Sequence, residues 1–288
     1  MLEKLIIGTV QFGLNYGITN LNGKVTNNDI DKIFKFCEEN QLYYFDTAQD
    51  YGDSEDILAK QIEKNNKLKI ITKGKFNYKN IDDVINKSIH KFNNIDCFLL
   101  HSYDDYKHEI INKLIFYKNK NFIKKIGISI YTVEEAIKIL DDYTINVIQL
   151  PYNYIDNQWD NPIFKHKLKI RYDVEIHVRS IFLQGLLLNK TVNTPKNIAK
   201  EDFDYLNKII DEITTELNIN KIELCFGYIN SCEWIHKFLI GIDNFEHLKE
   251  NYEIINKNIK LTTEQMLIIK EKTKNINNLI CNPSKWKF

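Results

Sequence analysis

Eight short apolar runs, separated by longer helical patterns, constrain the fold more than any other feature of this sequence. Each run is nearly continuous in Ile, Val, Leu and Phe, which is typical of strands buried on both faces of a parallel sheet. The predicted strands are 4–8, 42–46, 69–73, 97–101, 125–129, 147–150, 174–178 and 238–242.

The segments between these strands repeat apolar residues every three or four positions, as one face of a helix does. In the first long segment Ile30, Ile33 and Cys37 share one stripe, and Thr26 or Asn27 is the expected N-cap. The predicted helices are 27–40, 54–64, 81–92, 108–118, 133–140, 163–167, 201–217, 219–231, 245–255 and 262–272.

This alternation predicts an α/β chain folded as a single (β/α)8 TIM barrel. A doubly wound open sheet is the rival architecture, but the G-x-G-x-x-G turn that would favour it is absent from the sequence. No linker rich in Pro, Gly or Ser divides the chain, so residues 1–288 are expected to form one barrel, with 275–288 a C-terminal tail. The longest irregular stretch, 180–200, is a candidate binding loop.

Composition argues against several classes of function. Lys+Arg and Asp+Glu are both 39, and the pI is near 7.0, so nothing indicates binding to nucleic acid or to a membrane. The five cysteines form no C-x-x-C pair and no signal segment is visible, so a cytoplasmic protein with free thiols is expected. No ligand spacing indicates a metal site, and the sequence indicates no oligomeric state.

Polar side chains stand where three consecutive strands end. Asp46, Lys73 and His101 close the second, third and fourth strands, and Tyr51 follows in the first of these loops. In a parallel barrel the ends meet at one rim, where barrel enzymes keep their catalytic residues. Asp46 alone could be a helix cap and His101 alone a structural histidine, but their joint spacing favours a catalytic site.

These four residue types suit the reduction of a carbonyl group. A phenol has a pKa of about 10, and a neighbouring ammonium group lowers that pKa, while a carboxylate keeps the ammonium charged. Carbonyl reduction needs a proton for the developing alkoxide and a donor that polarises the C=O bond. A barrel isomerase or lyase that uses Lys73 as a Schiff base is an alternative.

Over nearly its whole length the chain resembles the aldo-keto reductase family. The stretch 45–55, FDTAQDYGDSE, resembles the family signature D-T-A-x-x-Y-G-x-S-E, and the segments around Lys73 and His101 resemble its lysine and histidine strands. The resemblance implies NAD(P)H-dependent reduction of an aldehyde, ketone or sugar to an alcohol, or the reverse reaction. Tyr51 would be the general acid or base, Lys73 and Asp46 would tune it, and His101 would orient a small-molecule carbonyl substrate.

The same resemblance implies a nicotinamide cofactor, NADP(H) rather than NAD(H), although NAD(H) remains possible. Ser129 and Gln149 match the carboxamide contacts, and Glu250 and Asn251 match the adenine contacts. The phosphate-binding Lys and Arg of the family correspond to Gly241 and His247, which weakens the case for NADP(H). The full set of implied cofactor positions is Gly8, Thr9, Ser129, Gln149, Arg179, Ser180, Gly241, His247, Glu250 and Asn251.

Two positions depart from the family pattern. Ile130 replaces the usual Asn, and Arg179 or Ser180 stands nearest to the position of the tyrosine that stacks on nicotinamide. Arg179 could grip a cofactor phosphate, bind an acidic substrate or pair with a carboxylate. The departures also fit an alternative function, a cofactor-binding sensor or assembly subunit with little turnover.

Three aromatic residues are expected to wall the substrate pocket, although aromatics more often belong to the core. They are Tyr152, Trp159 and Phe182. The run 179–187, RSIFLQGLL, resembles a subgroup of the family with members associated with cell-surface sugar pathways.

Overall fold

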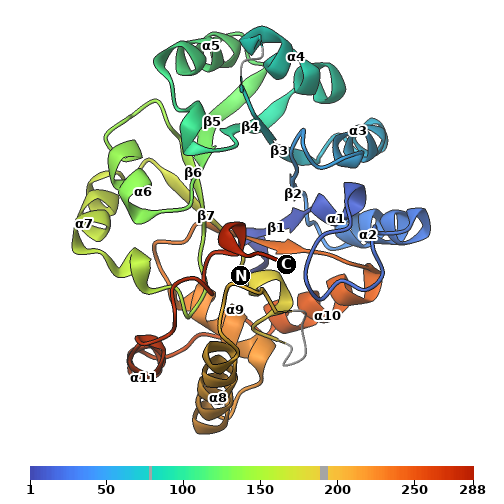
Figure 1. The fold of residues 1–288 in the computed structure, drawn as a ribbon. Coiled ribbons are helices and arrows are strands. Elements are labelled where there is room, and N and C mark those ends of the chain that lie inside the picture. The colour runs from blue at the N-terminus through green and yellow to red at the C-terminus, as the bar shows by residue number, and fades with distance from the viewer. Residues whose placement is uncertain (78–79, 189–193) are drawn as a thin grey trace.

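The computed structural model describes residues 1–77, 80–188 and 194–288. Eight parallel strands close into one barrel in chain order, with the helices outside it (Figure 1), which confirms the predicted (β/α)8 barrel. The strands are β1 (Leu5–Gly8), β2 (Tyr44–Asp46), β3 (Lys69–Gly74), β4 (Ile95–Leu100), β5 (Ile123–Ser129), β6 (Val147–Pro151), β7 (Glu175–Arg179) and β8 (Lys237–Gly241).

The helices follow the predicted pattern with one addition, the short helix α1 directly after β1. Two helices, α8 and α9, lie between β7 and β8, as predicted. The helices are α1 (Val10–Gly13), α2 (Asn27–Glu39), α3 (Ser54–Lys64), α4 (Ile81–Phe92), α5 (His108–Asn119), α6 (Val133–Ile139), α7 (Pro162–Ile170), α8 (Lys200–Leu217), α9 (Lys221–Ser231), α10 (Phe245–Asn256) and α11 (Thr263–Thr273). Among the described residues, no helix is both long and apolar enough to cross a membrane.

Local capping sets where several helices begin. Thr26 caps α2 by accepting a hydrogen bond from the backbone N–H of Asp29. Helix α7 is longer than the predicted 163–167, because Asn161 accepts from two backbone N–H groups of the first turn and Pro162 occupies the first helical position.

A cluster of apolar side chains at inward-facing strand positions fills the barrel interior; its buried members are Ile6, Ile71, Cys97, Leu99, Val147 and Leu239. Side chains alternate along a strand, so the residue two positions further on also faces inward. That position is Lys73 after Ile71 and Gln149 after Val147. The alternation therefore delivers polar side chains to the C-terminal rim of the barrel.

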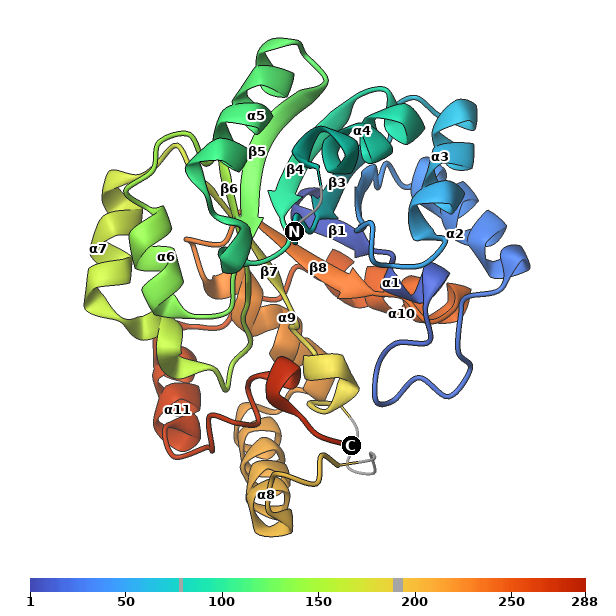
Figure 2. The same ribbon diagram turned by 45° about the horizontal axis from the view of Figure 1, so that its top comes forward.

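Two segments far apart in the chain approach each other beside this rim. The side chain of Gln184 donates to the Tyr16 hydroxyl at 3.2 Å, and Thr19 Oγ1 donates to the Gln184 carbonyl at 3.3 Å. The α1–α2 loop and the segment after β7 therefore meet (Figure 2). The predicted binding loop 180–200 begins here, and its residues 189–193 lie outside the described part of the chain.

The C-terminal segment after α11 is packed rather than loose. Trp286 is buried, and its indole N–H donates to the Leu279 carbonyl at 3.1 Å. Backbone hydrogen bonds join Lys196 N to Lys287 O at 2.7 Å, and Lys287 N donates to the Asn197 side chain at 2.9 Å. The tail thus fastens the stretch that precedes α8.

Candidate active site

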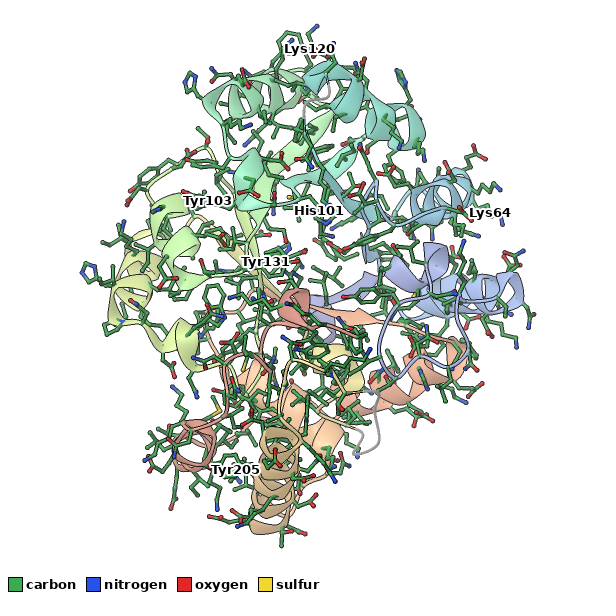
Figure 3. All side chains as sticks on the ribbon, viewed as in Figure 1. Lys64, His101, Tyr103, Lys120, Tyr131 and Tyr205 are labelled. Atoms are coloured by element: carbon green, nitrogen blue, oxygen red, sulfur yellow. The ribbon has the colours of Figure 1, made fainter. Side chains whose placement is uncertain are left out.

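The strand ends bring the four predicted catalytic residues to one cavity of about 820 Å³. Asp46 closes β2, Lys73 lies near the end of β3, His101 follows β4, and Tyr51 lies in the loop after β2. In Figure 3 His101 and Tyr131 lie towards the centre of the view, whereas Lys64, Lys120 and Tyr205 lie at the periphery.

A buried ion pair forms the floor of this cavity. Lys73 Nζ donates to Asp46 Oδ1, and both side chains are almost fully buried. Lys73 also donates to the Thr47 carbonyl at 2.9 Å, and Gln149 Nε2 donates to the second carboxylate oxygen of Asp46 at 2.8 Å. Asp46 therefore has no cap role, and its carboxylate is fixed by two neighbours.

Tyr51 lies against this pair. Lys73 Nζ is 5.1 Å from the centre of the Tyr51 ring, and the His101 ring meets it edge-on with 6.1 Å between centroids. Burial raises the pKa of the Tyr51 phenol, Asp46 adds to this effect, and Arg179 opposes it. The net direction is upward, whereas the sequence argument expected the ammonium group to lower the pKa. The phenol therefore keeps its proton at neutral pH, as a proton donor must.

His101 is neutral at physiological pH. Burial lowers its pKa to about 3, and the charges of Lys73 and Lys75 act in the same direction. A neutral imidazole carries one N–H donor and one acceptor nitrogen. His101 can therefore hydrogen-bond a carbonyl oxygen without adding a charge to the cavity.

Two glycines allow the backbone of the loop that carries Tyr51 to pack closely against helix α1. A Cβ atom on Gly13 would lie 1.7 Å from the Tyr51 carbonyl oxygen, and a Cβ on Gly52 would lie 2.4 Å from the Gly13 carbonyl oxygen. Gly52 also has φ of +54°, a left-handed conformation that favours glycine. Backbone packs directly on backbone here, which restricts where the phenol can point.

Several buried side chains support the same loop, and of these the sequence had pointed only to Thr9. The Ser54 hydroxyl lies 2.6 Å from Thr9 Oγ1 and 2.9 Å from Thr47 Oγ1, and all three residues are fully buried. Glu55 accepts from the Thr72 hydroxyl at 2.7 Å and likewise from Ser88. Ser54 and Glu55 end the quoted signature stretch 45–55, so that signature was the available signal.

All ten predicted cofactor positions line the same cavity as the catalytic residues. Gln149 Oε1 is buried and has no hydrogen-bond partner among the described residues. An amide N–H of a nicotinamide would satisfy this acceptor, so the residues present fit the cofactor. The Thr9 hydroxyl, by contrast, already donates to the Asp46 carbonyl at 2.9 Å.

Ile130, which replaces the usual Asn of the family, belongs to the hydrophobic core. Its side chain is fully buried in the core cluster between strands and helices and does not line the cavity. The Ile130 side chain therefore makes no contact with the cavity, whereas Tyr131 next to it lines the wall.

The far end of the cavity, lined by Gly241, His247, Glu250 and Asn251, also contains residues that the sequence did not point to. Asp243 Oδ2 lies 3.5 Å from His247 Nδ1, and Asp243 raises the pKa of that imidazole. Gln11 Nε2 donates to Asp243 Oδ1 at 3.1 Å, and Gln11 Oε1 has no partner among the described residues.

The prediction of the substrate wall needs a correction. Phe182 lines the cavity, but Tyr152 and Trp159 do not. The Tyr152 hydroxyl lies 3.3 Å from that of Tyr228, and Trp159 Nε1 donates to Asp156 at 3.2 Å. Gln149 faces into the barrel, so Tyr152, three residues later, faces the surrounding helices.

The aromatic residues that do line the cavity with Phe182 and Tyr51 are Tyr16 and Tyr131. Tyr131 stands two positions after inward-facing Ser129, so the strand alternation was a signal for it. Tyr16 lies in an irregular loop, where no periodic pattern applies. Among the described residues, no group of three or more His, Cys, Asp or Glu is placed to hold a metal ion.

The comparisons with known proteins agree with this geometry. The model of the "Aldo/keto reductase family" matches residues 4–274. The chain belongs to the aldo/keto reductase family. Membership supports an oxidoreductase that uses NAD(P)H and acts on small-molecule carbonyls. A search of the curated proteins gives no significant match.

Solved structures of aldo-keto reductases share the fold. AKR11C1 from Bacillus halodurans, in its holo form, is 18% identical to this chain and has a TM-score of 0.74. The match covers 93% of this chain and 91% of that chain. PA4992 from Pseudomonas aeruginosa, named as an aldo-keto reductase, is 17% identical, with a TM-score of 0.62 and coverages of 88% and 90%.

Proposed function

We propose that this chain reduces an aldehyde, ketone or sugar carbonyl to an alcohol with NAD(P)H, or runs the reverse oxidation, with Tyr51 as the general acid or base. The observation that carries the proposal is the convergence of Asp46, Tyr51, Lys73 and His101 on one cavity, with Lys73 Nζ 5.1 Å from the centre of the Tyr51 ring. The bound cofactor supplies or accepts the hydride.

The cofactor proposal rests on Gln149 and Ser129, which line the same cavity as Tyr51. The buried, unpartnered Oε1 of Gln149 would accept from the carboxamide, and Ser129 lines the cavity beside it. We favour NADP(H), with NAD(H) accepted, because His247 can carry a positive charge at the far end of the cavity. The five cysteines are buried free thiols, which supports a reducing compartment such as the cytoplasm.

In reduction, the Tyr51 hydroxyl would donate its proton to the oxygen that becomes an alkoxide. The raised pKa keeps this proton in place until the alkoxide, a stronger base, forms. Lys73 would then stabilise the phenolate, and the contacts of Asp46 with Lys73 and Gln149 hold that ammonium group in position. Neutral His101 would hydrogen-bond the carbonyl oxygen and orient it towards Tyr51.

Replacing Tyr51 by Phe tests the proposal. We expect kcat to fall by about 10²- to 10⁴-fold, the usual contribution of a positioned acid. The dissociation constant of NADPH, measured by tryptophan fluorescence, should change by less than about threefold, since only one hydroxyl is lost. Tyr103→Phe, outside the cavity, is the matched control. Turnover of Tyr51→Phe at the unmodified rate would refute the assignment.

A second candidate is a cofactor-binding sensor or assembly subunit. Ile130 and the missing stacking tyrosine favour it. Such a protein would quench fluorescence on binding NADPH yet reduce nothing in a broad carbonyl panel. A Schiff base at Lys73 is disfavoured, because Lys73 is engaged by Asp46 and the Thr47 carbonyl. Borohydride trapping of a carbonyl substrate on the protein would restore that alternative.

A further inference from the structure

Arg179 presents a rigidly held guanidinium group to the cavity. It ends β7, lines the cavity and is half-buried. Its Cζ lies 4.4 Å from the centre of the Tyr131 ring, and Nη2 donates to the Ile130 carbonyl at 3.2 Å. Stacking and one hydrogen bond therefore fix the plane of the group and leave most of its five N–H donors for another acceptor.

This guanidinium has no counter-charge in the described part of the protein. Arg171, the only other arginine, pairs with Asp173 at 2.8 Å, whereas no ion pair of Arg179 exists among residues 1–77, 80–188 and 194–288. The remaining residues, 78–79 and 189–193, include no Asp or Glu. Of the three interpretations open from sequence, pairing with a carboxylate of the protein is therefore removed.

In the part of the chain that the structure describes, the other charged side chains near the catalytic residues lie in pairs of opposite sign. Lys73 pairs with Asp46, and Lys75 pairs with Asp50 at 2.9 Å. His101 is neutral at physiological pH. Among the described residues, Arg179 thus leaves a positive charge without an acidic partner at this end of the cavity, and a partly desolvated charge is costly unless a partner meets it.

Arg179 acts on the place where a carbonyl would react. Burial raises the pKa of Tyr51 and lowers the pKa values of Lys73 and His101, and the charge of Arg179 acts in the downward direction on all three; these three residues line the cavity together with Arg179. At the far end of the cavity, Lys221 and His247 are the basic side chains that phosphate groups of a dinucleotide can meet, although each also lies near an aspartate, Asp211 at 3.9 Å and Asp243 at 3.5 Å. The unpaired charge therefore belongs to the substrate side.

We infer that Arg179 binds an anionic group carried by the carbonyl substrate, so that the preferred substrates are aldehydes or ketones bearing a carboxylate, phosphate or sulfate. The fork of N–H donors matches the two oxygens of such a group. This inference rests on the proposed carbonyl reduction and names its substrate class.

Matched aldehydes test the inference with the full-length protein. The substrates are the 2-, 3- and 4-carboxybenzaldehydes and their neutral methyl esters, each assayed with NADPH and with NADH. The proteins compared are the unmodified protein, Arg179→Met, Arg179→Lys and Lys75→Met. For each substrate the ratio of variant to unmodified rate is taken, because this cancels the electronic effect of the ester. Lys75→Met removes a cation of the same rim that already has its own partner.

We expect Arg179→Met to raise KM for at least one carboxybenzaldehyde about 10- to 100-fold, the usual range for a charge-assisted hydrogen bond. For that aldehyde, the ratio of variant to unmodified kcat/KM should fall at least about tenfold further than the same ratio for its methyl ester. Arg179→Lys should retain part of the affinity, and Lys75→Met should not separate acids from esters. An equal effect of Arg179→Met on acids and esters overturns the inference.

Two further readouts separate the possible outcomes. A tenfold rise in the NADPH dissociation constant of Arg179→Met, without selectivity between acids and esters, would assign Arg179 to a cofactor phosphate and overturn the inference. If no aldehyde is reduced by the unmodified protein, the proposed function fails, and titration of terephthalate into the protein–NADP⁺ complex decides the inference alone. Binding that disappears in Arg179→Met and is absent for dimethyl terephthalate supports it; equal binding to both proteins overturns it.

Discussion

The replacement Lys73→Met examines the buried ion pair on which the site depends. It removes the ammonium group and leaves the Asp46 carboxylate, with 4% of its side chain exposed, with Gln149 as its remaining hydrogen-bond donor among the described residues. Breaking a buried pair by removing one partner costs about 3–5 kcal/mol, because the remaining charge is left without compensation. We expect the free energy of unfolding to fall by that amount.

The expected change in melting temperature follows from chain length. An unfolding entropy of about 2.1 cal/mol/K per residue converts the loss into a decrease of about 5–8 °C in Tm for a chain of this size. Circular dichroism melts and urea titrations without cofactor measure it. Turnover should also fall, because the phenolate of Tyr51 loses the ammonium group that lies 5.1 Å from the centre of its ring.

The control is the neighbouring pair on the rim. Lys75 and Asp50 are 43% and 41% exposed, so Lys75→Met should cost less than about 1 kcal/mol. The double replacement of Lys73 by Met and Asp46 by Asn should recover much of the stability without recovering activity. If Lys73→Met is no less stable than Lys75→Met, the argument that a desolvated pair organises the site is wrong.

Three more predictions follow from the geometry. Burial lowers the pKa of His101 to about 3, so near pH 5 only the unfolded chain binds a proton on this imidazole. The free energy of unfolding should therefore decrease as pH falls below about 6.5. In urea titrations, His101→Asn should show a smaller dependence of this free energy on pH. Asp243 raises the pKa of His247, and protonated His247 should aid binding of the 2′-phosphate of NADPH. The affinity for NADPH relative to NADH should therefore fall as pH rises from 6 to 9. If fluorescence titration gives a constant affinity ratio over this range, His247 does not have this role. Gly13→Ala should lower kcat at least tenfold, because the added Cβ must displace the carbonyl of Tyr51, and an unchanged kcat would show that this contact does not hold the phenol.

The four catalytic residues could be predicted because regular structure carries them. Asp46 and Lys73 stand at inward positions where strands end, and His101 follows its strand directly. Once eight parallel strands are inferred, closure of the barrel brings these ends together without any knowledge of side-chain packing. A periodic pattern and a topology are enough for this part of the site.

The pocket wall could not be predicted in the same way. Tyr152 and Trp159 follow β6 closely in sequence, but they pack among the surrounding helices. Gln11 and Tyr16 come from a short helix and an irregular loop whose course no repeat in the sequence specifies. The direction of the Tyr51 pKa was also missed, since residue types reveal neighbouring charges but not the extent of burial that outweighs them.

The packed C-terminal segment has a practical consequence. The family match ends at residue 274, yet Lys287 is hydrogen-bonded to the stretch at 196–197, which follows the segment that carries Phe182 and Gln184 on the cavity wall. Shortening the protein to the part that the family shares would therefore remove the hydrogen bonds that hold residues 196–197. Purification tags are better attached at the amino end. Related sequences that lack this C-terminal extension should stabilise the stretch before α8 through other contacts.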